Sequence, residues 1–85
     1  MTRFEEKIRL AILVLKALRS KPLTFTQLEK RTLIQCGTHS TFISILRYLK
    51  QQEFIEKAGV EHTAPYRITA KGLKFLEAWE NEQPV

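Results

Sequence analysis

The residues of this chain with the clearest chemical potential lie along a helix predicted over 38–52. At about 100° per residue, one side of this helix gathers short hydroxyls, an amide and a guanidinium. These are Ser40, Ser44, Arg47 and Gln51, flanked by Ile43, Tyr48 and Lys50. Such side chains can hydrogen-bond to base edges, and none of them is acidic. The alternative interpretation is an ordinary solvated surface, which more often carries Glu and Lys pairs.

Metal binding and catalysis have few candidate residues. Cys36-x-x-His39 has a spacing that structural zinc sites use, and His62 is the second histidine. These three residues do not complete a tetrahedral site, so we expect Cys36 to fill space in a helical turn; a redox-sensing role for it is a separate hypothesis. The chain also lacks Asp, a Gly-rich phosphate loop and a Ser-His-Asp arrangement. We therefore expect no catalytic residue, no metal and no cofactor.

The positive charge is concentrated in the first part of the chain. The net charge is +5, but residues 1–50 hold ten Lys or Arg and three Glu, whereas residues 51–85 hold four and six. Clustered cations attract phosphates and release their counterions. This asymmetry favours a polyanionic partner that approaches the first part of the chain.

Length and composition predict a single globular domain over residues 1–85, because 44% of the residues are hydrophobic and 27% are charged. One cysteine excludes an intramolecular disulfide and fits a reducing compartment. The longest apolar run, Leu10 to Leu15, is too short to span a bilayer, and no small-residue cleavage site follows it. We therefore expect a cytoplasmic protein without a membrane partner.

Capping motifs predict the first two helices. Residues 2–5, Thr-Arg-Phe-Glu, have capping-box spacing and begin a helix over 3–20, which Pro22 ends. A second box, Thr24 with Gln27, begins a helix over 24–32, with staple leucines at 23 and 28. Gly37 then lies where a tight turn between two helices needs a glycine.

The first helix carries more apolar surface than one core needs. A second apolar stripe runs along it, and a chain of this size could hardly cover both stripes. We expect this stripe and the last helix to form a homodimer interface. The residues of that interface are Leu10, Leu13, Val14, Ala17, Phe75, Leu76 and Trp79. The alternative is that the last helix covers the stripe within the same chain.

After Gln52 the pattern changes from helical to strand-like. Two short runs with aromatic and β-branched residues predict a hairpin over 54–68. Thr69 then caps a last helix over 70–80. The expected fold class is α+β and mostly helical, with three helices, a two-stranded hairpin and a C-terminal helix.

Two segments resemble a known family. YRITAKGLKFLEAW, residues 66–79, resembles the stretch that closes the wing and opens the last helix of small prokaryotic winged helix-turn-helix proteins. FISILRYLKQQEFIEK, residues 42–57, resembles their recognition helix and the following strand. The first two helices are similar to the archaeal-type branch of this family, a relative of the ArsR, MarR and PadR groups. The likeness covers about residues 3–79.

The resemblance implies a homodimeric transcription regulator that binds a specific sequence of double-stranded DNA. The third helix would enter the major groove, and the wing would touch the flanking backbone. The implied groove contacts are Ser40, Ile43, Ser44, Arg47 and Tyr48, and the implied phosphate contacts are Lys50, Lys57 and Arg67.

This chain departs from the family pattern at Glu53, where the family commonly has Gly just before the strand. Because of this residue, the sequence does not determine where the third helix ends. Glu53 also adds an acid near the expected DNA side. The wing is also poor in cations, so we expect a weak wing contribution. The alternative function is a winged-helix protein interaction module, in which the positive charge is incidental.

Overall fold

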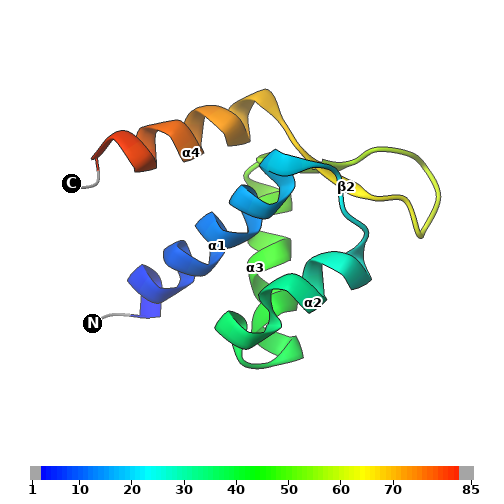
Figure 1. The fold of residues 1–85 in the computed structure, drawn as a ribbon, viewed down its shortest axis with the longest axis horizontal. Coiled ribbons are helices and arrows are strands. Elements are labelled where there is room, and N and C mark those ends of the chain that lie inside the picture. The colour runs from blue at the N-terminus through cyan, green and yellow to red at the C-terminus, as the bar shows by residue number, and fades with distance from the viewer. Residues whose placement is uncertain (1–2, 83–85) are drawn as a thin grey trace.

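Four helices and one short hairpin make up the part of the chain that the structure describes, residues 3–82 of a computed structural model. The elements are α1 (Arg3–Ser20), α2 (Phe25–Cys36), α3 (His39–Gln51), β1 (Ile55–Lys57), β2 (Tyr66–Ile68) and α4 (Ala70–Glu82). In Figure 1, α3 crosses α1, α4 runs along the opposite side of α1, and the hairpin loop extends away from both chain ends. The fold is a small, mostly helical α+β arrangement.

The first two helices follow from their sequence signals, with one difference in length. The α1 helix occupies the predicted range, although its expected cap, Thr2, lies outside the described residues. At the start of α2, the amide of Thr24 donates to Oε1 of Gln27 (3.0 Å), and the amide of Gln27 donates to Oγ1 of Thr24 (3.3 Å). This reciprocal capping satisfies two amides that the helix leaves free.

The α2 helix continues to Cys36, four residues beyond the end predicted at Thr32. Thr32 does not interrupt the helix, because its buried hydroxyl donates to the carbonyl of Leu28 (2.9 Å) and is satisfied inside it. The first residue with a left-handed backbone is Gly37, at φ 85°. The helix therefore ends at the turn glycine, where the backbone conformation changes.

The α3 helix begins at a cap that the sequence motifs did not identify. Thr38 has an extended backbone, and its Oγ1 accepts from the amide of Thr41 (3.1 Å). One face of α3 is completely internal, and its buried residues are Phe42, Ile45, Leu46 and Leu49. The spacing of i, i+3, i+4 and i+7 predicted this stripe.

A single hydrophobic core joins all the helices and both strands. It takes residues from both apolar stripes of α1, from Leu28 of α2, from the inner face of α3 and from Leu76 of α4. Burying a large aliphatic side chain contributes about 1.5–3 kcal/mol. Since so many buried positions lie on α1 and α3, the crossing of these two helices is the centre of the fold.

The turn after α3 fixes where the hairpin starts. The amide of Phe54 donates to the carbonyl of Leu49, and the amide of Glu53 donates to the carbonyl of Lys50, both at 3.0 Å. These two bonds and a left-handed residue at φ 63°, Glu53, form a Schellman motif. Glu53 thus adopts the conformation that favours the glycine commonly found there in the resembling family.

The start of α4 is bonded to the same turn. The hydroxyl of Thr69 donates to the carbonyl of Glu53 (2.7 Å), and its amide donates to the carbonyl of Phe54 (3.0 Å). The Thr69 hydroxyl also accepts from the amide of Gly72 (3.0 Å), which caps α4 as predicted. Gly72 lies so close to this turn that a Cβ there would overlap the carbonyl oxygen of Phe54.

The hairpin pairs three residues of each strand. Its antiparallel register places Ile55 opposite Ile68, Glu56 opposite Arg67, and Lys57 opposite Tyr66. Because side chains alternate along a strand, the middle pair lies on the opposite face from the two outer pairs.

The segment between α1 and α2 also joins the hairpin. The amide of Leu23 donates to the carbonyl of Tyr66 (3.1 Å), and the amide of Tyr66 donates to the carbonyl of Leu23 (2.7 Å). The sheet edge is thereby attached to the start of α2.

None of the described helices combines the length and apolarity that a membrane-crossing segment requires.

Replacing Gly72 by Ala should lower the free energy of unfolding by about 2 kcal/mol, because the added Cβ collides with backbone. Without this contact, alanine would stabilise a helical position, so the sign of the change is diagnostic. Urea unfolding measures it. Gly59→Ala is the control: its Cβ would lie at an ordinary 3.5 Å from that of Ala64. We expect it to change stability by less than about 0.5 kcal/mol.

Replacing Glu53 by Gly should raise the free energy of unfolding by about 0.5–1 kcal/mol, because glycine removes the cost of a left-handed residue. Gln52→Gly is the matched control. Its backbone is right-handed, with φ −80° and ψ −5°, and glycine there should lower stability by about 0.5–1 kcal/mol. Equal changes at the two positions in urea unfolding would contradict this explanation.

Candidate nucleic-acid interface

The outward face of α3 is polar, basic and free of carboxylates along the whole helix. Burial of the opposite stripe fixes the rotation of α3, so this face is directed away from the core. Its exposed residues are Ser40, Ser44, Arg47, Lys50 and Gln51, with Ile43 and Tyr48 half-buried at its edges. The structure therefore brings the residues expected to contact bases onto one helix surface.

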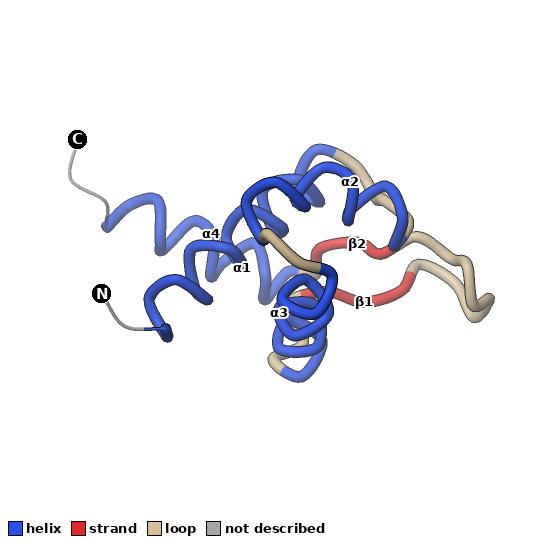
Figure 2. Tube along the Cα trace, turned by 90° about the horizontal axis from the view of Figure 1, so that it is seen from below, coloured by secondary structure: helices blue, strands red, loops and turns tan. Residues whose placement is uncertain are grey.

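Two cavities border this face on opposite sides. One, of about 420 Å³, is open to solvent and is bordered by Phe25 and Tyr66. Its residues from α3 are Ile43, Leu46, Arg47, Lys50 and Gln51. The other, of about 510 Å³, is lined by Ser40 and Ser44 and, from α1, by Glu6 and Lys7. The serines thus border α1, whereas the Arg47 side of the helix borders α2 and the hairpin. Figure 2, which looks along α3, shows α2 and the hairpin beside it.

Tyr48 lies at the edge of the face and contacts α1. The ammonium of Lys7 is 5.4 Å from the centre of its ring, and Tyr48 packs against the hydrophobic core. A cation at this distance is attracted by the ring. Tyr48 therefore binds α1 within the chain, and the centre of the exposed face belongs to Ser44 and Arg47.

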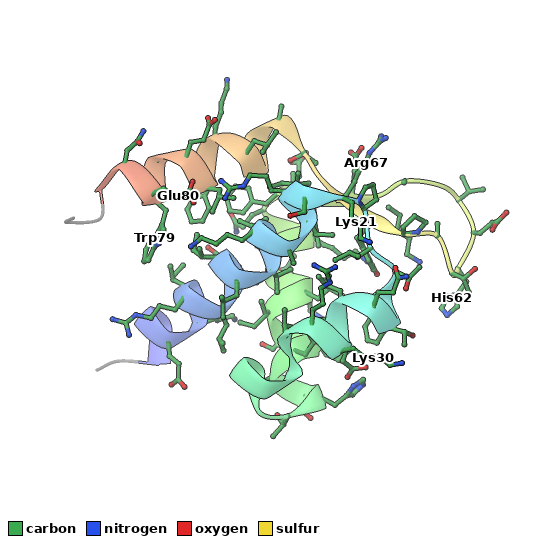
Figure 3. All side chains as sticks on the ribbon, viewed as in Figure 1. Lys21, Lys30, His62, Arg67, Trp79 and Glu80 are labelled. Atoms are coloured by element: carbon green, nitrogen blue, oxygen red, sulfur yellow. The ribbon has the colours of Figure 1, made fainter. Side chains whose placement is uncertain are left out.

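The two hairpin cations expected to bind phosphate lie on opposite faces of the sheet. Nε of Arg67 donates to Oε2 of Glu56 (2.7 Å), its cross-strand partner. Figure 3 shows Arg67 on the side of the hairpin that faces away from α2. Lys57, in contrast, is on the same face as Tyr66. The structure therefore places Lys57 beside Tyr66 and the start of α2, and it places Arg67 on the other face in an ion pair.

A third cavity, of about 540 Å³, lies between the hairpin and the start of α2. Its polar lining residues include Lys57, His62, Thr24, Thr26 and Thr63. No carboxylate lines it. It adjoins the cavity beside Arg47, because Phe25 and Tyr66 border both. The Arg47 side of α3 and the Tyr66 face of the hairpin are thus parts of one surface whose lining lacks carboxylates.

Tyr66 is a residue of this surface that the sequence patterns did not select. Its ring lies 5.9 Å from the ammonium of Lys50 and 5.7 Å from that of Lys57. Burial raises the pKa of its phenol, so the hydroxyl stays neutral well into the alkaline range. Strand alternation predicts that Tyr66 lies on the inner face. That a lysine of α3 approaches its ring is visible only in the three-dimensional fold.

One acid, Glu6 of α1, lines the cavity beside Ser40 and Ser44, and other acids lie at the margins of the α3 face. Glu53, exposed just beyond α3, is the acid that the sequence placed near the expected DNA side. Glu29 of α2 is bonded through its carboxylate to Nδ1 of His39. This pair holds His39 against α2, away from the centre of the α3 face.

No cluster of three potential metal ligands occurs among the residues whose side chains are described. His39 is at the start of α3, and Figure 3 shows His62 at the far end of the hairpin loop. Cys36 ends α2, and its side chain lies outside the described part of the structure.

The expected dimer interface is only partly exposed. Leu10, Val14 and Leu76 are buried within one chain, at 8%, 0% and 0% exposure, so these three offer no surface to a partner. For these positions the prediction is wrong: this part of the second α1 stripe is internal. The reason is that α1 packs simultaneously against α2, α3 and α4.

Four residues of the expected dimer interface stay half-buried: Leu13, Ala17, Phe75 and Trp79. Phe75 is already stacked on Phe54, with ring centres 4.6 Å apart. Figure 3 shows Trp79 pointing from α4 toward α1.

An ion pair ties the ends of α1 and α4. Nη1 of Arg19 donates to Oε1 of Glu80 at 2.8 Å. Hydrogen bonding to this guanidinium lowers the pKa of Glu80, and the carboxylate raises the pKa of Arg19. Both groups are exposed, so the pair orients the end of α4 and adds little stability.

These features define a class: a small, mostly helical α+β domain with a basic, acid-poor face on one helix. No protein-family model, no curated protein and no solved structure matches this chain. The function is therefore inferred from the site itself.

Proposed function

We propose that this chain is a winged helix-turn-helix regulator of transcription that binds double-stranded DNA as a homodimer. In this proposal α3 is the recognition helix in the major groove, and the hairpin is the wing on the flanking backbone. The observation that carries the proposal is the outward face of α3, where an exposed arginine lies among short polar side chains and the helix itself carries no acid.

The dimensions of α3 support this role. The helix has 13 residues, about 20 Å at the helical rise per residue, and a B-DNA major groove about 12 Å wide admits one helix. Ser40 and Ser44 are short, so they allow close approach to base edges. Arg47 is exposed and has no ion-pair partner among the described side chains. Its guanidinium is available for the bidentate contact that arginine makes with guanine.

The charges on the hairpin support a modest contribution from the wing. Lys57 shares the Tyr66 face of the hairpin, whereas Arg67 is engaged by Glu56. A cation already paired with a carboxylate releases fewer counterions from DNA. In this proposal, Lys50 and Lys57 make the main phosphate contacts around Tyr66, and affinity depends more on α3 than on the wing.

Fluorescence anisotropy with random duplex DNA at two salt concentrations tests DNA binding directly. We expect affinity to fall as salt rises, because each neutralised phosphate contributes a slope of about −0.9. Absence of salt-sensitive binding even at low ionic strength would favour the alternative, a winged-helix module that binds another protein.

Replacing Arg47 by Ala should cost about 1–3 kcal/mol in binding to a preferred duplex and should relax discrimination at one base pair. Selection from a random duplex pool, followed by anisotropy on matched and mismatched duplexes, measures both effects. Lys74→Ala, at an exposed position of α4, is the control. A uniform loss for all sequences, with a salt slope smaller by about one, would instead assign Arg47 to a phosphate.

The homodimer is proposed to use Trp79, with Leu13 and Ala17 as further candidates. Trp79→Ser should weaken self-association at least about tenfold, since tryptophans dominate many interfaces. Glu77→Ser, an exposed neighbour on α4, should leave association unchanged. Sedimentation velocity measures both variants, and thermal unfolding checks that they fold. A monomeric unaltered chain at all concentrations would remove the two-fold symmetric operator from the proposal.

A further inference from the structure

The ring of Tyr66 lies where four segments of the chain meet. Tyr66 belongs to β2 and pairs with Lys57 of β1. Its backbone is bonded to Leu23 before α2 in both directions, and Lys50 reaches its ring from α3. No other described aromatic ring attracts lysines from two different elements.

Tyr66 itself has little freedom to move. It is 6% exposed and belongs to the hydrophobic core cluster. Its two backbone bonds with Leu23, at 3.1 and 2.7 Å, hold the strand position. The ring is therefore a fixed surface for the more mobile lysine side chains beside it.

The two lysines are flexible side chains that this ring restrains. A free lysine loses substantial rotamer entropy when its ammonium binds one phosphate. Lys50 lies 5.9 Å from the ring centre and Lys57 lies 5.7 Å from it, within the range of cation–π attraction. Lys57 is further held by donating to the carbonyl of His62 (2.9 Å). Ordering before binding lowers the entropic cost of binding.

We propose that Tyr66 is a positioning residue for duplex binding, whose ring holds the ammonium groups of Lys50 and Lys57 toward the DNA backbone. This role rests on the proposed function. Lys50 borders the cavity beside Arg47, and Lys57 borders the cavity beside the start of α2. Tyr66 borders both cavities. One ring therefore positions both Lys50 of the recognition helix and Lys57 of the wing.

A double-mutant cycle on duplex binding separates positioning from a general structural role. In the unaltered background, Tyr66→Leu should weaken binding of a random duplex about fivefold, since two lysines lose their preorganisation. In a background carrying Lys50→Gln and Lys57→Gln, the same change should have no effect, because no ammonium remains to be positioned. Tyr66→Phe keeps the ring and should bind like the unaltered chain.

Lys71 provides a matched control. Its ammonium lies 5.9 Å from the ring centre of Phe54, but it belongs to α4 and borders neither of the two cavities. Lys71→Gln removes one charge from a similar lysine and ring pair. It should change affinity less than Lys50→Gln does in the same low-salt anisotropy titration.

A second measurement needs no substitution. In the NMR spectrum of the unaltered chain, ring currents should shift the ε-methylene protons of Lys50 and Lys57 upfield relative to those of Lys74. Unshifted protons would overturn the proposed positioning even if Tyr66→Leu fails to fold. Equal losses for Tyr66→Leu in both backgrounds would overturn it as well. Absence of salt-sensitive duplex binding by the unaltered chain would overturn the proposed function together with this role.

Discussion

The left-handed turn at Glu53 and Phe54 is the constraint on which the rest of the structure depends. Through backbone bonds it ends α3, and through the side chain and amide of Thr69 it also sets the start of α4. Gly72 approaches this turn so closely that a side chain there would overlap the carbonyl oxygen of Phe54. One turn therefore links the end of α3, the start of the hairpin and the start of α4.

The distribution of charge gives α3 and the hairpin different roles in the proposed interface. The α3 face keeps Arg47 unpaired among the described residues, while the hairpin uses Arg67 to balance Glu56. Surface pairs of this kind contribute little to stability, but they remove a cation from the positive field that would attract DNA under the proposed function. Sequence discrimination is therefore proposed to reside in α3, with the hairpin contributing orientation.

Local signals predicted much of this fold. The capping box of Thr24 and Gln27 and the apolar stripe of α3 depend on neighbours within one turn, so the sequence was sufficient for them. The end of α2 at Cys36 was missed because the Thr32 hydroxyl is satisfied inside the helix. The burial of Val14 and Leu76 and the two lysines at Tyr66 depend on contacts between distant segments. The periodicity of apolar residues along the sequence does not predict contacts of this kind.

The pairing of Leu23 with Tyr66 has a mechanical consequence. A two-stranded hairpin attached only at its base could adopt many orientations. Fixing one of them on binding would cost conformational entropy. Two backbone bonds to the segment before α2 make a third attachment point. The hairpin and the first turn of α2 should therefore move as one rigid body. A binding partner would therefore meet a fixed distance between the hairpin and α2. The partner, and not this domain, would have to change shape to fit.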